Sequence, residues 1–347
     1  MVHPARRARG TLVLLAAATL AACGGSSPAV PPAVRATAPE PAVAPPTTVT
    51  PAGVLLSVGR QPEGIVADGP TDELAVSVRG GATGDGVEIV SLAQQRIIGF
   101  AATDGAARHL QLAAPGGPVL VPAEGSDTLY RVSLGAAGVQ SSAKVGRQPH
   151  DATAIGGKVL VTDELANTVS VLLGTTVTAT VAVPVQPGGI AAGRTTDGRT
   201  PVALVVGVRG RQVEALTPTG ASLGRADAGL GPTHVRFGGG RFYVADTSGN
   251  QILVYTVDAK GPHEVGRVTT GGGTPYGLAV DSARGRVWVT LTARNQLQEY
   301  RISGNSLALE ATFPTPRQPN DVTVDEATGQ VAVAGTGADE IQLLNAR

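Results

Sequence analysis

An all-β fold of seven repeated units is predicted by three features of the sequence. A phrase that usually contains proline recurs every 38 to 46 residues, and about four short apolar runs follow each phrase. The chain also holds 47 glycines and 25 prolines among 347 residues, a composition that suits short strands joined by tight turns rather than a helical bundle. A repeat of this length with four strands is typical of a β-propeller blade. We therefore expect seven four-stranded antiparallel blades.

The seven units begin at corresponding nine-residue phrases. They are RQPEGIVAD (60–68), AARHLQLAA (106–114), RQPHDATAI (147–155), VQPGGIAAG (185–193), LGPTHVRFG (230–238), GTPYGLAVD (273–281) and RQPNDVTVD (317–325). Only the second phrase lacks the proline, with Arg108 in its place. The first strand of each unit is expected to begin just after this position.

The interior of each unit fits the same pattern. A second strand such as GKVLVTD (157–163) is followed by a polar turn and a third strand such as VSVLL (169–173). An Asp or Asn precedes the third strand in six units, namely Asp85, Asp127, Asn167, Asn250, Asn295 and Asp339, whereas the fourth unit has Arg211. Because Asp and Asn tolerate left-handed backbone and cap turns, we interpret this column as structural.

The two ends of the repeat region complement each other. The seventh unit stops after three strands, at DEIQLLNAR, and an unassigned strand, GVLLSV (53–58), precedes the first unit. If residues 53–58 supply the outer strand of the last blade, the ring closes and leaves no open sheet edge there. The predicted propeller domain is therefore 53–347, and we expect it to be a monomer.

The first 52 residues predict export and anchoring. Arg6, Arg7 and Arg9 precede an apolar run of ten residues, TLVLLAAATL (11–20), which suits a secretory signal and is too short to span a bilayer. The following LAAC resembles the lipobox of bacterial lipoproteins. This resemblance implies a signal peptide at 1–22, a palmitate-type lipid on Cys23, and attachment to the outer face of the cytoplasmic membrane. A cleaved signal with an incidental cysteine is the alternative. The Pro/Ala-rich residues 23–52 are expected to be an extended tether.

Two segments resemble known repeat families. YVADTSGNQILVY (243–255) is similar to the repeat of NHL propellers, and VGRQPEGIVAD (58–68) is similar to the opening of YVTN-type propellers, which are common among secreted bacterial proteins. The resemblance implies a propeller over most of 53–347. It does not imply one function, because propellers include enzymes, binding proteins and scaffolds.

Polar residues just after each proline are expected to surround one mouth of the central channel. The predicted ligand-binding residues are His109, His150, Asp151, His234, Tyr276, Asn320, Asp321 and, before its proline, Arg147. His150 and His234 are candidate catalytic residues, and with Glu63 they are candidate ligands of one divalent metal ion, because imidazole and carboxylate groups bind such ions and transfer protons. The alternative is that these residues only cap turns and contact water.

The recurring Arg60, Arg147 and Arg317 suit an anionic ligand. The alternatives are ion pairs with neighbouring blades, for which Asp163 and Asp246 at the ends of second strands are natural partners, or a simple solvated rim. The formal net charge of zero gives no reason to expect nucleic acid as a partner.

Binding of an envelope protein or small molecule at the mouth is the leading functional prediction. The alternative is a metal-dependent hydrolase or lyase. Glu63 and Asn320–Asp321 are similar in kind to the metal ligands of propeller lactonases. Propeller lyases that act on cyclic peptide antibiotics resemble the chain in blade number and in a mouth histidine, and Glu63 or Asp151 would then hold their magnesium ion. A purely structural envelope protein is the third interpretation.

Overall fold

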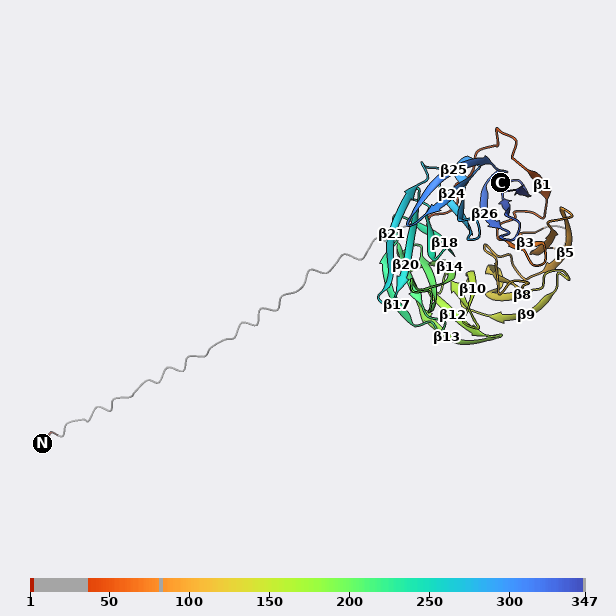
Figure 1. The fold of residues 1–347 in the computed structure, drawn as a ribbon. Coiled ribbons are helices and arrows are strands. Elements are labelled where there is room, and N and C mark those ends of the chain that lie inside the picture. The colour runs from red at the N-terminus through yellow and green to blue at the C-terminus, as the bar shows by residue number, and fades with distance from the viewer. Residues whose placement is uncertain (3–36, 81–83, 346–347) are drawn as a thin grey trace. The chain divides into compact units, whose positions relative to one another are not determined.

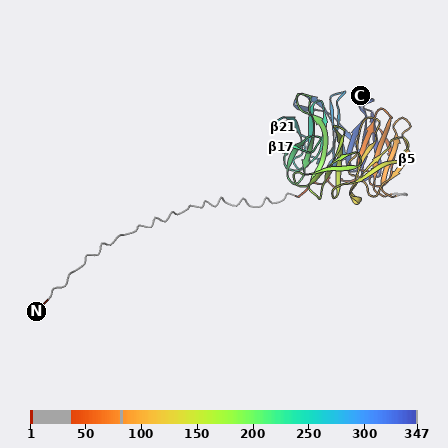
Figure 2. The same ribbon diagram turned by 90° about the horizontal axis from the view of Figure 1, so that it is seen from below.

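The computed structural model describes residues 1–2, 37–80 and 84–345. Residues 36–347 form one compact unit, and this unit is the predicted seven-bladed ring (Figure 1). Seen from the side, the strands run between the two faces of the ring (Figure 2). The predicted signal peptide and Cys23 lie outside the described residues, apart from residues 1–2. Among the described residues, no helix has the length and apolar character needed to cross a membrane.

Each blade is a sheet of four antiparallel strands, ordered from the channel outwards. Blade 1 has β2 (Ile65–Asp68), β3 (Glu73–Val78), β4 (Gly86–Ser91) and β5 (Arg96–Ala102). Blade 2 has β6 (Gln111–Leu112), β7 (Val119–Ala123), β8 (Thr128–Val132) and β9 (Val139–Lys144). Blade 3 has β10 (Pro149–Ile155), β11 (Lys158–Asp163), β12 (Thr168–Leu173) and β13 (Thr176–Ala182). Blade 4 has β14 (Pro187–Arg194), β15 (Pro201–Gly207), β16 (Gln212–Leu216) and β17 (Ser222–Asp227).

The remaining blades follow the same order. Blade 5 has β18 (Pro232–Gly238), β19 (Arg241–Asp246), β20 (Gln251–Asp258) and β21 (Gly261–Thr269). Blade 6 has β22 (Pro275–Asp281), β23 (Arg286–Leu291), β24 (Gln296–Ser303) and β25 (Ser306–Pro314). Blade 7 has β26 (Pro319–Val324), β27 (Gln330–Gly335), β28 (Glu340–Asn345) and β1 (Val54–Ser57). Two short 3-10 turns, η1 (Glu124–Ser126) and η2 (Thr292–Arg294), are the only helical elements in the described part of the chain.

The predicted closure of the ring is confirmed. Strand β1 pairs antiparallel with β28, from Val54 opposite Leu343 to Ser57 opposite Glu340. Leu56 also packs against the apolar cluster between blades 7 and 1. The first and last parts of the propeller are thereby joined by backbone hydrogen bonds, which protects an edge that would otherwise be open to another strand.

The apolar core lies between the blades rather than at the centre of the ring. Seven buried clusters each span two neighbouring sheets. Between blades 6 and 7, for example, Trp288 packs with Val322 and Val333. Because this packing fills the wedges between sheets, the inner ends of the seven innermost strands remain available for polar side chains.

The Asp/Asn column joins one blade to the next, which explains why the proline phrase is repeated. Asn167 has φ 57° and its side chain accepts a 2.8 Å hydrogen bond from the backbone N–H of Gln186, just before the next proline. The same bond links Asp127 to Gln148, Asn250 to Thr274, Asn295 to Gln318 and Asp339 to Gln61. Arg211 has the left-handed backbone of the column, with φ 52°, and Asp85 instead accepts from Gly80 in its own blade.

The expected start of the innermost strands holds for blades 3 to 7, where they begin at the proline. In blades 1 and 2 the innermost strands begin slightly later, at Ile65 and Gln111, and β6 has only two residues. In blade 2 the chain before β6 is held by the neighbouring blade, since the Ala107 N–H donates to the Ser77 hydroxyl at 2.9 Å.

Candidate functional site

Three histidines from blades 2, 3 and 5 meet at the mouth of the channel. The ring centroids of His109 and His234 are 4.1 Å apart, those of His109 and His150 are 5.1 Å apart, and those of His150 and His234 are 6.1 Å apart. One potential ligand atom from each ring lies within 4.8 Å of the other two. All three side chains are buried.

Local backbone features bring these rings together. The pairing of β10 with β11 shifts register between Pro149 and Asp151, and that of β18 with β19 shifts between Pro232 and Val235. Such bulges re-aim side chains near functional sites, and here they contain His150 and His234. Gly189 permits the close approach of β14 and β18, because a Cβ at this position would lie 2.8 Å from the His234 Cα.

Hydrogen bonds orient two of the three rings. The Nδ1–H of His150 donates to Glu164 at 3.0 Å, and the Nδ1–H of His234 donates to the Tyr276 carbonyl oxygen at 2.9 Å. In the neutral form of each ring, these bonds leave Nε2 with a free lone pair. Within the described residues, neither ring nitrogen of His109 has a hydrogen-bond partner, and the Nε2 of His234 also lacks one. Nδ1 of His109 lies 3.5 Å from Asp321 Oδ2.

The three histidines differ in electrostatic environment. Burial, with the neighbouring histidines and Arg236, holds the pKa values of His109 and His234 well below their usual range. Burial alone would also lower the pKa of His150, but the hydrogen bond and charge of Glu164 outweigh it and raise that pKa. The same contact lowers the pKa of Glu164 to about 2, although burial of this carboxyl acts in the opposite direction. The cluster thus contains two neutral imidazoles beside one that pairs with a carboxylate.

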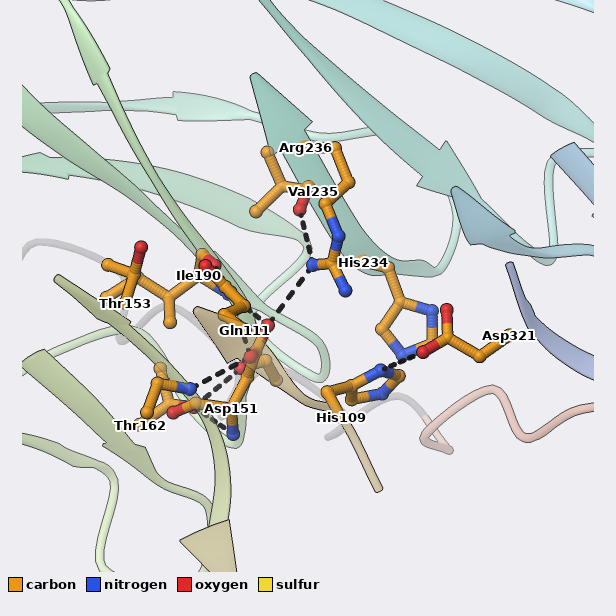
Figure 3. A network of polar contacts seen from close by, with 12 residues as sticks. His109, Gln111, Asp151, Thr153, Thr162, Ile190, His234, Val235, Arg236 and Asp321 are labelled. Atoms are coloured by element: carbon orange, nitrogen blue, oxygen red, sulfur yellow. Dashed lines mark hydrogen bonds and ion pairs between the residues drawn. The ribbon is translucent and has the colours of Figure 1, made fainter. Parts of the chain in front are cut away.

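A layer of buried charged groups flanks His109 and His234 (Figure 3). Asp151, with no exposed surface, accepts hydrogen bonds from Gln111 at 2.9 Å and from the Ile190 N–H at 3.2 Å, and pairs with Arg236 at 3.3 Å. Asp321 lies on the other side of His109, and burial raises its pKa to about 7. Below this layer the channel widens into a cavity of about 720 Å³ that Arg236 also lines.

The rim above the histidines carries a chain of ion pairs. Arg79 contacts Glu63 at 3.3 Å and Glu124 at 3.2 Å. Arg108 lies 2.7 Å from Glu124, and Glu124 together with Glu63 raises the pKa of this guanidinium against the opposing effect of burial. The predicted metal candidate Glu63 is therefore directed towards Arg79. The third member of the cluster with His150 and His234 is His109 rather than Glu63.

The second half of the predicted 23–52 tether, residues 37–52, contacts the propeller. We call residues 38–45 the cap segment. Ala38 packs against the core of blades 4 and 5, Glu40 pairs with Arg108 at 3.2 Å, and the Ala44 carbonyl oxygen accepts from Arg317 at 3.2 Å. Pro39 and Glu40, together with the histidine pair His150 and His234, line a cavity of only about 10 Å³. The cap segment therefore covers the mouth.

Of the remaining sequence-predicted residues, Tyr276 contacts the histidine cluster and Arg147 does not. Tyr276 contacts His234 edge to face, with ring centroids 4.3 Å apart, and Asn320 is buried with no hydrogen-bond partner for its Oδ1 among the described residues. Arg147 does not join them, because its guanidinium donates to the Leu165 carbonyl oxygen in an exposed contact.

The suggested pairing of Asp163 and Asp246 with the repeated arginines is wrong. Asp163 accepts from the Gly146 N–H and the Ser170 hydroxyl, and Asp246 accepts from the Gly231 N–H. These carboxylates hold the turn before the proline of their own blade. Gly146 is needed there, since a Cβ on it would lie 2.4 Å from the Asp163 carboxyl.

Sequence reasoning missed Glu164, Arg236 and Arg108 as parts of the site. Glu164 follows Asp163 at the end of a second strand, and Arg236 lies four residues after its proline, facing the channel. Arg236 could have been identified as the next channel-facing position of its innermost strand. Glu164 could have been identified from its place at the end of a second strand.

Comparison with known proteins supports the fold and gives a partial family match. A family model described as the SMP-30/gluconolactonase/LRE-like region matches residues 236–325, about a quarter of the chain. The matched segment contains Tyr276, Asn320 and Asp321 but none of the three clustered histidines. None of the curated proteins compared with the chain matches it.

Several solved structures share the architecture. Hydrazine synthase of Kuenenia stuttgartiensis is 16% identical, with a TM-score of 0.68 over 86% of this chain and 98% of that chain. A streptogramin B lyase is 15% identical, with a TM-score of 0.66 over 84% of this chain and 98% of that chain. The β-propeller domain of Cps50 (Swd1) from Myceliophteria thermophila is 12% identical, with a TM-score of 0.67 over 85% and 99%. At these identities the likeness concerns the fold alone.

Proposed function

We propose that the channel mouth is the site of a divalent-metal-dependent hydrolase or lyase in which His109, His150 and His234 hold the ion. The observation that carries this proposal is the convergence of three buried imidazoles, two of which have ring nitrogens without a partner among the described residues. Burying an unpaired polar atom is costly. A set of three histidines with a carboxylate behind one of them suits zinc or a related ion.

The surrounding residues fit this chemistry. Glu164 and the Tyr276 carbonyl oxygen fix the tautomers of His150 and His234, which leaves both Nε2 atoms as ligands. A divalent ion bound there would polarise a substrate carbonyl or lower the pKa of a bound water. The partial match to the gluconolactonase-like family model and the fold shared with a lyase favour this class, and a cyclic ester is the substrate class that we propose to test first.

The first test is the metal content of the purified full chain. We expect about one divalent ion per chain, or a raised melting temperature with zinc, manganese, magnesium or calcium. A His150→Ala/His234→Ala variant should bind the ion at least ~100-fold more weakly, and Glu164→Gln roughly 10- to 100-fold more weakly because it orients a ligand. His263→Ala, an exposed histidine outside the site, is the control. No retained ion and no melting shift with any of the four would contradict the proposal.

A binding protein without turnover is the second candidate, and the cap segment favours it. A cavity of about 10 Å³ holds no more than a water molecule, so no substrate fits while the cap is in place. Lactone and cyclic-ester substrates should be hydrolysed by the wild type and not by the double variant if the site is catalytic. Capture of an envelope partner that needs His150 and His234, without turnover, would favour the binding role.

We also propose that the propeller is a monomeric lipoprotein anchored through Cys23 to the outer face of the cytoplasmic membrane. The supporting observation is the arginine-rich start, short apolar run and LAAC sequence. Because residues 37–52 contact the propeller, residues 23–36 would be the part that links it to the lipid. A Cys23→Ser variant should leave the membrane fraction, and continued membrane retention would argue against the anchor.

A further inference from the structure

The cap segment is docked at its C-terminal end, packs against blades 4 and 5 only through Ala38 at its other end, and is loosely placed over the histidines between these points. Towards its C-terminal end, the Ala42 N–H donates to the Thr292 hydroxyl at 3.0 Å, and the Ala44 carbonyl oxygen accepts from Arg317 at 3.2 Å. Ala44 is 2% exposed, and the carbonyl oxygen of the following Pro45 accepts from Asn295 at 2.9 Å. These contacts dock residues 42–45 on blades 6 and 7.

Over the histidine cluster, the attachment of the cap segment is weaker. The polar contact recorded there is the ion pair between Glu40 and Arg108, in which the Glu40 side chain is 59% exposed. Exposed ion pairs contribute little to stability. Pro39 and Glu40 belong to no strand, so their departure would break no sheet hydrogen bond. Its departure would therefore cost the packing of the half-buried Ala38 against blades 4 and 5 but would break no strand pairing within a blade.

The groups left behind define what can replace it. Arg108 is held by Glu124 on one side and by Glu40 on the other. When Glu40 leaves, the guanidinium regains a free side for a carboxylate, which arginine recognises with paired N–H donors. The space that Pro39 and Glu40 occupy lies beside His150 and His234, and a proline-flanked glutamate, as in Pro-Glu-Pro at 39–41, favours an extended backbone. The shape and charge therefore favour an extended acidic ligand.

We propose that residues 38–45 are a displaceable cap on the histidine cluster, and that an extended, carboxylate-bearing, peptide-like ligand takes its place with the carboxylate on Arg108. The cap itself does not depend on metal binding or turnover. The ligand class rests on the proposed function only in that such a ligand would be the substrate of the site.

The cap is tested by two neighbouring substitutions in the full chain. Ala44→Asp places a charge at a buried position and should release the cap, whereas Val43→Asp places the same charge at a residue that is 84% exposed. The readout is the rate of diethyl pyrocarbonate modification of His150 and His234 in chelator-treated, metal-free protein, measured by peptide mass spectrometry, with exposed His263 as the internal reference. We expect at least a ~10-fold faster reaction in Ala44→Asp and the wild-type rate in Val43→Asp. Equal rates in all three proteins, or equal acceleration by both substitutions, would overturn the cap.

The ligand class is tested in the Ala44→Asp protein with a synthetic peptide of residues 36–46. The peptide should restore the slow modification rate, and the same peptide with Glu40→Gln should protect several-fold less well. Lack of protection by either peptide, or equal protection by both, would overturn the carboxylate assignment. Unchanged melting temperatures of both variants show that the propeller is intact. Because modification needs neither metal nor turnover, fast labelling without zinc binding would reject the metal site and retain the cap. Zinc binding together with equal labelling rates in all three proteins would support the metal site and reject the cap.

Discussion

Replacing His109 with leucine should raise the melting temperature of the metal-free protein and at the same time abolish metal binding. His109 is 1% exposed, and neither of its ring nitrogens has a hydrogen-bond partner among the described residues. Burial holds its pKa well below the usual range, so no charge is lost with the ring. Leucine has a similar size and removes two buried unpaired polar atoms, each of which costs roughly 1–3 kcal/mol. We expect a net gain of about 1–3 kcal/mol.

Both halves of this result can be measured on one preparation. After chelation, thermal unfolding of His109→Leu should begin roughly 2–9 °C above that of the wild type, from about 2–3 °C per kcal/mol for a domain of this size. Zinc titration should show at least a ~100-fold loss of affinity. His263→Leu should change neither value. A less stable His109→Leu protein would mean that the ring is part of the packing rather than a retained ligand.

Replacing Asp151 with alanine should have the largest destabilising effect of any single change at the site. Its carboxylate accepts from Gln111, from the backbone N–H groups of Ala152 and Ile190, and from Arg236. These donors come from blades 2, 3, 4 and 5. Alanine would leave a largely buried guanidinium and several N–H groups without their acceptor, and breaking such a pair costs about 3–5 kcal/mol.

Thermal unfolding tests this expectation. At roughly 2–3 °C per kcal/mol, the melting temperature of Asp151→Ala should fall by about 6–15 °C. Asp197→Ala is the matched control, because Asp197 makes similar contacts in an exposed turn, and substitutions there should stay within roughly 1 kcal/mol. A fall no larger than that of the control would show that Arg236 finds another partner or water.

The fold could be predicted from the sequence because its signals are local. The repeated phrase, the short apolar runs and the Asp/Asn column each act within one unit, and six of the seven column residues have the left-handed backbone that the turn requires. The free strand at 53–58 and the missing strand of the last unit predicted closure, which the pairing of β1 with β28 confirms.

The candidate site was only partly accessible to the same reasoning. Equivalent positions in equivalent repeats lie at the same height in a ring, so His109, His150 and His234 could be expected near one mouth. The residues that contact these histidines could not be predicted in the same way. Glu164 reaches His150 from a second strand, Arg236 lies one layer down the channel, and Glu63 has the expected position but faces Arg79.

Taken by itself, the sequence determined the seven blades, their strand order and the closure of the ring, because the repeated phrase, the short apolar runs and the turn residues specify a strand and its neighbour. Tertiary structure alone decided which side chains meet across the channel. Those contacts join residues as far apart in the sequence as His109 and Asp321, and their orientations depend on bulges and on close approach at Gly189. It also decided the place of the cap. Residues 38–45 have no periodicity of their own, and the surface that binds them exists only once blades 6 and 7 have formed beside Arg108.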